Sequence, residues 1–370
     1  MSKWDLGLVE RAFGEAALDP VAWVKALDTA TAVSGSFGSI LLPVKGDQLP
    51  NVPFTESLSK TTESYFCDGW HLRDERQLGL GVLVKRGVID DLDILSEQSI
   101  KKHPYYQEFL APHGLRWFAG VKVHCGNDLW CLSIQRTFDQ GPFSKAEKQR
   151  LAQLSNALST SAALARAMSG ATANGALEAF ELSSTGVVLI NRMGEVFKAN
   201  RTAERLLTGD VTIIKRRLTA KDKAATEKLD RALYELMWRR VGAALSPPVA
   251  LTRDGRRPLL DYPAKLAAMT ANALADCQAV VILVDPDDAR VPPLDTLRVA
   301  FGLSEAESRL AAQLASGQAL ETAADQSGIA KETSRTQLKS IFAKTGVHRQ
   351  AELVALLAPL LGKVKSDPGD

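Results

Sequence analysis

The sequence predicts an α+β multidomain fold, with two mixed α/β domains on antiparallel sheets followed by an all-α domain of four helices. The first observation is the length of 370 residues, which exceeds one ordinary domain. The second is a pair of breaks, one of small residues at 169–175 and one with three prolines at 285–293. The third is that strand patterns precede the second break and only helical patterns follow it. Together they place domains at 1–168, 175–287 and 297–362.

Composition indicates a folded, soluble protein. Apolar residues make up 45% of the chain and charged residues 24%, which is typical of domains that form a core. The longest apolar runs, such as 279–284, are far shorter than the roughly 20 residues that span a bilayer, and the N-terminus lacks a secretory signal pattern. We therefore expect a cytoplasmic protein without a membrane anchor. The net charge of +2 neither indicates nor excludes a nucleic-acid partner.

No pattern of an enzyme or of a metal site stands out in the sequence. The four cysteines form no CxxC pair, and the five histidines share no metal-ligand spacing. A nucleophile with its base and a phosphate-binding glycine loop are not recognised either. We therefore expect no catalytic activity, no metal and no disulfide framework, and the sequence identifies no cofactor.

The first domain combines helices with a sheet. Two amphipathic helices are predicted at 5–17 and 20–31, and a strand at 36–44. A hairpin follows at 117–136, where Gly126-Asn-Asp128 separates two runs rich in β-branched and aromatic residues.

A long helix is predicted to start at Ser144, because Ser144 and Glu147 have the S-x-x-E spacing of a capping box. Apolar residues then recur every three or four positions: Leu151, Leu154, Leu158, Ala162 and Ala165. This seam either pairs with a second copy in a parallel dimer or packs on its own domain, and both interpretations stay open. The length of the domain and the helix that leads out of it resemble a GAF domain, which implies a sensor.

Five residues of the first domain are candidates for a small-molecule pocket: Trp70, His71, Asp74, Tyr105 and Trp117. They combine aromatic rings with hydrogen-bonding groups, which is the mixture that ligand pockets use. The alternative is that they are ordinary core and loop residues. The sequence does not identify the ligand.

The second domain opens with a strand, a turn, a second strand and a helix. Gly186-Val-Val-Leu-Ile is the first strand, Gly194 lies in the turn, Ala199-Asn200 ends the second strand, and Leu206-Leu207 lies in the helix. These residues resemble the opening of a PAS domain, and the match covers about the first third of the domain. The resemblance implies a second sensor domain with an antiparallel sheet.

The third domain is predicted to contain four helices. An S-x-x-E capping box at 304–307 begins the first helix, and Gly317 ends it. A short alanine-rich helix at 320–326 precedes the third helix at 331–344, and the last helix starts near Gln350.

Basic charge is concentrated on the third helix. Residues 331–350 contain five basic residues and one acid, a balance of +4, whereas residues 304–330 carry −3. Helical spacing puts polar residues on one side of this helix: Lys331, Arg335, Thr336 and Lys339. Such a strip suits a helix in the DNA major groove, where phosphates attract cations and arginine or lysine can donate to guanine. Taken alone, it is also the ordinary solvated face of a helix.

The order of residues in this domain resembles the LuxR/GerE helix-turn-helix signature over roughly 60 residues without a gap. The matching positions are Leu303, Ser304, Glu307, Ala315, Gly317, Ala323, Ala324, Gly328, Ile329, Thr333, Arg335, Leu338, Ile341, Lys344, Gly346, Val347, Glu352, Leu353 and Val354. The resemblance implies that Arg335, Thr336 and Lys339 reach base edges. It also implies phosphate contacts from a second set: Thr333, Gln337 and Lys344.

Two departures from the family pattern leave the operator sequence open. Ser334 stands where the family often has valine, and Gln337 stands where it often has histidine. Neither change affects the predicted fold of the domain.

The sequence therefore predicts a homodimeric, sequence-specific transcription regulator that binds double-stranded DNA and responds to a signal, with a small molecule as the candidate signal. The competing hypothesis is a sensory protein that acts through protein contacts, its terminal helices serving as a dimerisation module. The identity of the signal and the choice between activation and repression are not encoded in any pattern that we recognise.

Overall fold

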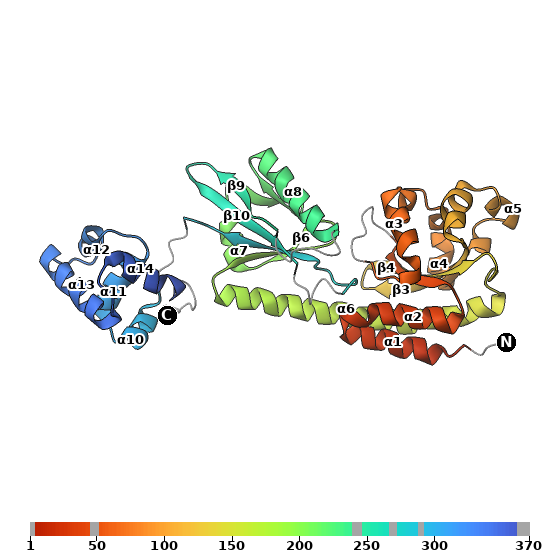
Figure 1. The fold of residues 1–370 in the computed structure, drawn as a ribbon, viewed down its shortest axis with the longest axis horizontal. Helices are drawn as coiled ribbons and strands as arrows, with labels where there is room; N and C mark the ends of the chain where they lie inside the picture. Colours follow the sequence, from red (N-terminus) through yellow and green to blue (C-terminus); the bar gives the residue numbers. More distant parts are fainter. Residues whose placement is uncertain (1–3, 45–51, 239–245, 266–271, 288–291, 361–370) are drawn as a thin grey trace.

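The structure is a computed structural model that describes residues 4–44, 52–238, 246–265, 272–287 and 292–360. Figure 1 shows three bodies in succession, with the long helix α6 passing from the first to the second. The first two contain helices and antiparallel sheets, and the third is helical, so the predicted α+β class is confirmed at this level. The expected domain end at 362 and residues 288–291 of the proline-containing break lie outside the described residues.

The first body is built on a four-stranded antiparallel sheet in the order β1-β4-β3-β2. Its strands are β1 (Gly38–Pro43), β2 (Val88–Asp90), β3 (Leu115–Cys125) and β4 (Asp128–Thr137). Gly126 has a φ of +62°, which favours glycine, and it makes the predicted turn between β3 and β4. Alternate residues of each strand face opposite sides of the sheet, so each side has its own core.

Three longer helices cover one side of this sheet: α1 (Leu6–Leu18), α2 (Trp23–Ser34) and α6 (Lys145–Leu182). Their apolar residues, among them Phe13 and Leu154, pack on Val121 and Leu132. The other side carries α3 (Ser59–Cys67), α4 (Leu80–Arg86), α5 (Glu97–Ile100) and a π-helical turn at Tyr105–Leu110. The two predicted helices, the first strand and the hairpin are thus confirmed.

Helix α6 begins at the predicted capping box, with Ser144 and Glu147 each accepting from the other's backbone amide. Its apolar seam from Leu151 to Ala165 is buried in the core of the first body, which decides the open alternative in favour of packing on its own domain. The break predicted at 169–175 is wrong, because α6 continues through these residues. Ala173 and Leu177 are buried against the second sheet, and this burial offsets the low helix propensity of the glycines.

The second body has a five-stranded antiparallel sheet in the order β6-β5-β11-β10-β9. Its elements are β5 (Gly186–Ile190), β6 (Val196–Ala199), α7 (Arg201–Leu206), β7 (Val211–Ile214), β8 (Arg217–Ala220), α8 (Lys223–Trp238), β9 (Val249–Arg253), β10 (Arg256–Ala264) and β11 (Ala279–Val284). The predicted strand, turn, strand and helix are confirmed, with Gly194 at φ +73° in the turn and the Asn200 side chain capping α7. One side of the sheet packs on α6 and the other on α7 and α8.

A segment between β10 and β11 docks the second body on the first. Ala273 and Leu274 belong to the apolar core of the first body. The Asn272 amide nitrogen donates to the Ala165 carbonyl oxygen of α6 at 2.9 Å. The guanidinium of Arg192 donates to the Ala273 carbonyl oxygen at 2.7 Å and lies 4.6 Å from the ring centre of Trp130. The two bodies therefore share a packed interface in addition to α6.

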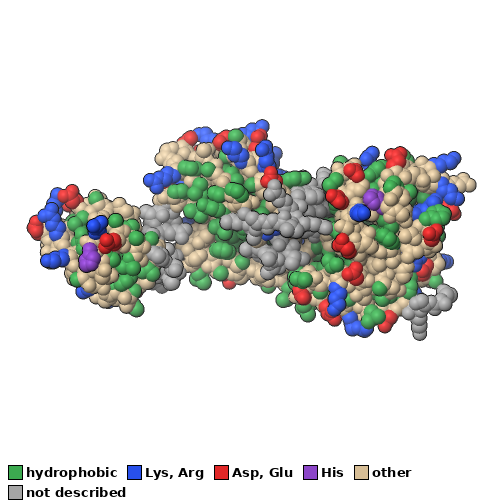
Figure 2. All heavy atoms as spheres, viewed as in Figure 1, with side chains coloured by type: hydrophobic (Ala, Val, Ile, Leu, Met, Phe, Trp, Pro, Cys, Tyr) green, Lys and Arg blue, Asp and Glu red, His purple; other side chains and the backbone are tan. Residues whose placement is uncertain are grey.

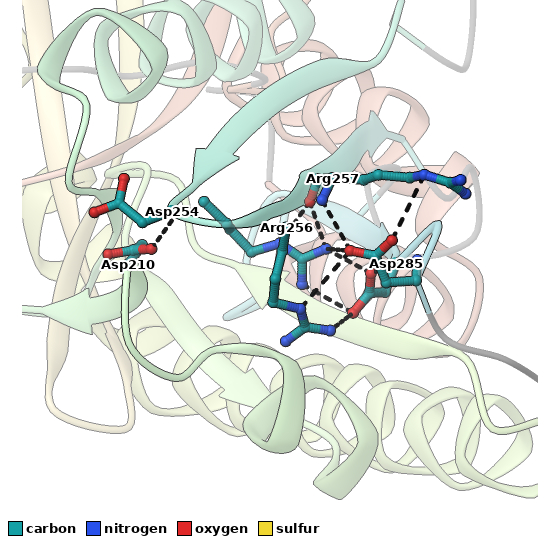
Figure 3. A network of polar contacts seen from close by, with 7 residues as sticks. Asp210, Asp254, Arg256, Arg257 and Asp285 are labelled. Carbon is teal, nitrogen blue, oxygen red and sulfur yellow. Dashed lines mark hydrogen bonds and ion pairs between the residues drawn. The ribbon is translucent and has the colours of Figure 1, made fainter.

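Arginine side chains hold the end of the second sheet, from which the chain leaves toward the third body. Arg253 makes two hydrogen bonds to the buried Asp285 carboxylate, at 2.8 and 2.5 Å. Arg256 adds a third at 2.9 Å, and Figure 3 shows Arg256 and Arg257 converging on this end of the sheet. These charged hydrogen bonds lower the pKa of Asp285 and anchor the point at which the chain departs.

The third body contains all four predicted helices: α11 (Glu305–Ala315), α12 (Leu320–Gln326), α13 (Lys331–Thr345) and α14 (Gln350–Leu357). Helix α10 (Leu294–Phe301), which the sequence pattern did not predict, precedes them and buries Leu297 in the shared core. The core also contains Leu310, Leu314, Ile341 and Leu353. This arrangement fixes α13 with one side against the domain.

Candidate nucleic-acid interface and internal pocket

Helix α13 presents two different sides, as its sequence predicts. Ser334 and Ile341 are buried, and Leu338 and Phe342 pack against the apolar core. The opposite side exposes Lys331, Thr333, Arg335, Thr336 and Lys339. Helix α12 can approach α13 closely because its contact positions, Ala323 and Ala324, carry only a methyl group and are fully buried.

A buried carboxylate ties α13 to α11. Glu307 accepts hydrogen bonds from the Ser340 hydroxyl at 2.6 Å and from the Lys344 ammonium at 2.7 Å. It also accepts from the Ser304 amide at 2.6 Å in the predicted capping box. Burial alone would raise the pKa of Glu307, but the bonds from Lys344, Ser340 and Ser304 outweigh it and lower the pKa to about 2. Glu307 is therefore ionised at neutral pH and holds α13 in place.

The predicted base-reading residues all lie on the exposed side of α13. Arg335 forms an exposed ion pair with Glu332 at 3.1 Å, and the Thr336 hydroxyl donates to the Glu332 carbonyl oxygen. Lys331 pairs with Glu321 of α12 at 3.0 Å, and Lys339 is exposed. Exposed ion pairs of this kind contribute little stability, so a phosphate can replace the glutamates as partners.

One of the three predicted phosphate contacts, Lys344, is engaged in an ion pair within the protein. The ammonium of Lys344 is bound to Glu307, although 38% of the Lys344 side chain is exposed. The amide oxygen of Gln337 is buried and has no hydrogen-bond partner among the described residues. Thr333 is exposed near the start of α13. Their roles toward phosphate stay predictions.

Acidic residues lie among the basic ones at this end of the molecule. Figure 2 shows Lys and Arg side chains mixed with Asp and Glu where Figure 1 places α12 and α13. Ion pairs join Lys331 to Glu321 and Arg335 to Glu332. The counts of charge along the sequence separated the two helices, whereas the fold places Glu321 of α12 beside Lys331 of α13.

The first body encloses a pocket of about 470 Å³ between its sheet and the short helices. Three of the five predicted ligand residues line it: His71, Asp74 and Tyr105. Trp70 and Trp117 are not among its lining residues. The Trp70 ring instead stacks on the Phe109 ring, and the Arg73 guanidinium lies over the Trp70 ring. Trp117 is buried in the apolar core around the pocket.

The polar lining that the sequence did not point to comes from several elements: Tyr65, Arg76, Cys131, Ser133 and Gln135. Cys131, Ser133 and Gln135 occupy every second position of the predicted strand β4. This alternation of polar residues is the sequence signal that could have identified them as lining residues. Tyr65 and Arg76 follow no such pattern.

Arg76 is the buried centre of this pocket's hydrogen bonding. Its guanidinium pairs with Asp91 at 2.9 Å and donates to the Gln135 side-chain oxygen at 3.1 Å. Asp91 also accepts from the Tyr106 hydroxyl and the Phe118 amide, each at 2.6 Å. Burial alone would lower the pKa of Arg76, but the charge of Asp91 raises it overall, so the guanidinium stays charged.

Asp74 is the second carboxylate of the pocket. It accepts hydrogen bonds from the Tyr65 hydroxyl at 2.7 Å and from the Arg76 backbone amide at 2.9 Å. Burial, followed by the charge of Asp74, raises the pKa of Tyr65 and of Tyr105, so both phenols remain neutral donors. Asp74 has no ion-pair partner within hydrogen-bond distance among the described residues.

No protein-family model matches the sequence, and no curated protein is significantly similar to it. Among solved structures, the LBD of VqsR from Pseudomonas aeruginosa is 19% identical, with 40% of this chain and 90% of that one covered and a TM-score of 0.32. The Vibrio cholerae VqmA complex with ligand and DNA is 14% identical, with 52% and 89% covered and a TM-score of 0.24. The E. coli DhaR(N)–DhaL complex is 11% identical, with 75% and 86% covered and a TM-score of 0.25. At these TM-scores the likeness carries no argument.

Within the described residues, no helix is both long enough and apolar enough to cross a membrane. The same part of the chain contains no group of three or more His, Cys, Asp or Glu side chains placed to hold a metal ion.

Proposed function

We propose that the protein is a sequence-specific transcription regulator that binds double-stranded DNA through α13. The observation that carries this proposal is the two-sided helix: Arg335, Thr336 and Lys339 are exposed, while Ser334 and Ile341 anchor the opposite side. A helix presented in this way fits the major groove, where arginine and lysine donate to guanine and threonine contacts bases or phosphates. The LuxR/GerE resemblance of 303–354 supports the same role.

The protein acts as a homodimer in this proposal, because two-fold related heads match the two halves of an operator. Helix α14 supports it through Leu356, which is 37% exposed on the outside of the third body. The first two domains are proposed to be GAF-like and PAS-like sensors. The pocket of the first domain supports a signal-receiving role, and its packed junction with the second domain offers a route by which ligand binding could bias their arrangement.

Replacing Arg335 and Lys339 together by alanine is expected to weaken binding to selected promoter fragments by about 100-fold or more. The variant loses base-edge donors and phosphate attraction, so the dependence of affinity on salt should also become shallower. Fluorescence anisotropy across a salt series measures both quantities.

The matched control is Arg309→Ala, which removes an exposed arginine of α11 that pairs with Glu305. It should leave DNA affinity nearly unchanged. Unchanged affinity in the double variant, with the fold intact by circular dichroism, would overturn the DNA-binding proposal. Absence of salt-dependent, sequence-selective binding by the unaltered chain would favour the alternative of a protein-contact module.

A further inference from the structure

We propose that the pocket of the first domain binds a small organic ammonium ion with an aromatic or apolar body, and that the carboxylate of Asp74 is its counter-ion. The proposal names a ligand class for the signal site and in that respect rests on the proposed function. The charges, the walls and the size of the pocket all favour such a cation.

The positively charged guanidinium of Arg76 already has hydrogen-bond acceptors within the protein. Each of the three guanidinium nitrogens of Arg76 has an acceptor: Asp91 at 2.9 Å, Gln135 at 3.1 Å and the Arg116 carbonyl oxygen at 3.5 Å. The side chains of Arg76 and Asp91 are only 7% and 1% exposed, so Arg76 lines the pocket as one half of a buried ion pair. An anionic ligand would have to compete with Asp91 for this cation, which disfavours carboxylate or phosphate ligands.

The carboxylate of Asp74, in contrast, has no positively charged hydrogen-bond donor among the described residues. Its hydrogen-bond donors are the Tyr65 phenol and the Arg76 backbone amide, both neutral. Asp74 and Asp91 together carry two negative charges against the single positive charge of Arg76, which leaves one net negative charge among the three. Burial raises the pKa of Cys131 to about 12, so its thiol adds no charge. A partly buried carboxylate without an ion partner gains from a cation that enters the pocket.

The walls suit a cation that carries a ring or an alkyl chain. Tyr65 and Tyr105 both line the pocket and pack on Phe109, with ring centres 5.7 and 5.3 Å from it. Aromatic faces attract ammonium groups electrostatically. The remaining walls are aliphatic, including Leu58 and Leu83, and the volume of about 470 Å³ lies within the range of small-molecule sites.

Three indoles that share one ring system but differ in charge test this proposal: tryptamine, indole-3-acetamide and indole-3-acetate. Calorimetry on the full chain at neutral pH should give a tryptamine affinity at least about tenfold above that of the neutral amide, with the acetate weakest. An equal or higher affinity for the amide or the acetate overturns the proposal. Failure of tryptamine to bind at millimolar concentration overturns it as well.

Asp74→Asn should weaken tryptamine binding about tenfold and change amide binding less than about twofold, because only the cation loses its counter-ion. Asp139→Asn removes an exposed carboxylate outside the pocket lining and should change neither affinity. A tryptamine affinity unaffected in a folded Asp74→Asn protein overturns the assignment of Asp74. Should this variant not fold, the comparison of the three indoles on the unaltered chain decides. The Arg335/Lys339 double variant should retain tryptamine binding, so the ligand and DNA proposals fail separately.

Discussion

Asp261→Asn is expected to stabilise the second domain by about 4 kcal/mol at pH 7 and by almost nothing near pH 4. Asp261 lies in β10 opposite Val249 and Leu283, is fully buried, and neither carboxylate oxygen has a hydrogen-bond partner among the described residues. Burial raises its pKa to about 8. The folded domain therefore keeps a proton that the unfolded chain releases at a pKa near 3.9.

The sign of the pH dependence follows from this difference. Between about pH 4 and pH 8 the unfolded state is ionised and the folded state is not, so each pH unit costs the unaltered domain about 1.4 kcal/mol. Asparagine has the same shape but does not titrate, so the variant avoids this loss. Amide hydrogen exchange in β9, β10 and β11 across a pH series measures the domain's own free energy of unfolding.

Asp230→Asn is the matched control for this experiment. It makes the same chemical change in the same domain, but at a carboxylate of α8 that is 40% exposed and pairs with an exposed arginine. Its effect should stay below about 1 kcal/mol at every pH. A stability gain from Asp261→Asn that does not grow with pH would contradict the predicted titration.

Glu307→Ala is expected to destabilise the third domain by about 3 kcal/mol at neutral pH. The substitution removes the acceptor for Ser304, Ser340 and Lys344 at once and leaves the lysine ammonium without its partner. The lowered pKa of about 2 means that this stabilisation is present above pH 4.5 and is lost as the pH falls toward 2. Amide exchange in α11 and α13 reports the loss, and DNA affinity should fall with it because α13 is no longer held.

The control for Glu307 lies two residues earlier. Glu305 is 66% exposed and pairs with an exposed Arg309, so Glu305→Ala should cost no more than about 1 kcal/mol. Equal effects of the two substitutions would show that the buried network around Glu307 contributes nothing beyond an ordinary surface pair.

Short sequence patterns predicted those features of the fold that depend only on neighbouring residues. The capping boxes at Ser144 and Ser304 predicted two helix starts, because a side chain that satisfies amides three residues away acts within one turn. The turn at Gly126 and the two sides of α13 were predictable for the same reason, since backbone freedom and helical period depend on neighbouring residues.

The exposed positions of α13 could therefore be predicted, and the lining of the pocket only in part. The Lys344 ammonium binds Glu307 because α11 packs against α13, a contact that no helical period encodes. In the pocket, Arg76 meets Gln135 across 59 positions of sequence. Trp70 and Trp117 have the right chemistry for a pocket but pack elsewhere.

The sequence by itself determined the α+β class, the order of sheets and helices in the three bodies, and the residues exposed on α13. Tertiary structure alone decided that α6 runs unbroken through 169–175, because the burial of Ala173 and Leu177 outweighs local propensity. It also decided that the seam from Leu151 packs within its own domain, and that Arg76 and Asp91 cancel each other beside Asp74. These outcomes depend on which surfaces meet, and burial and charge pairing act between residues that are distant in the chain.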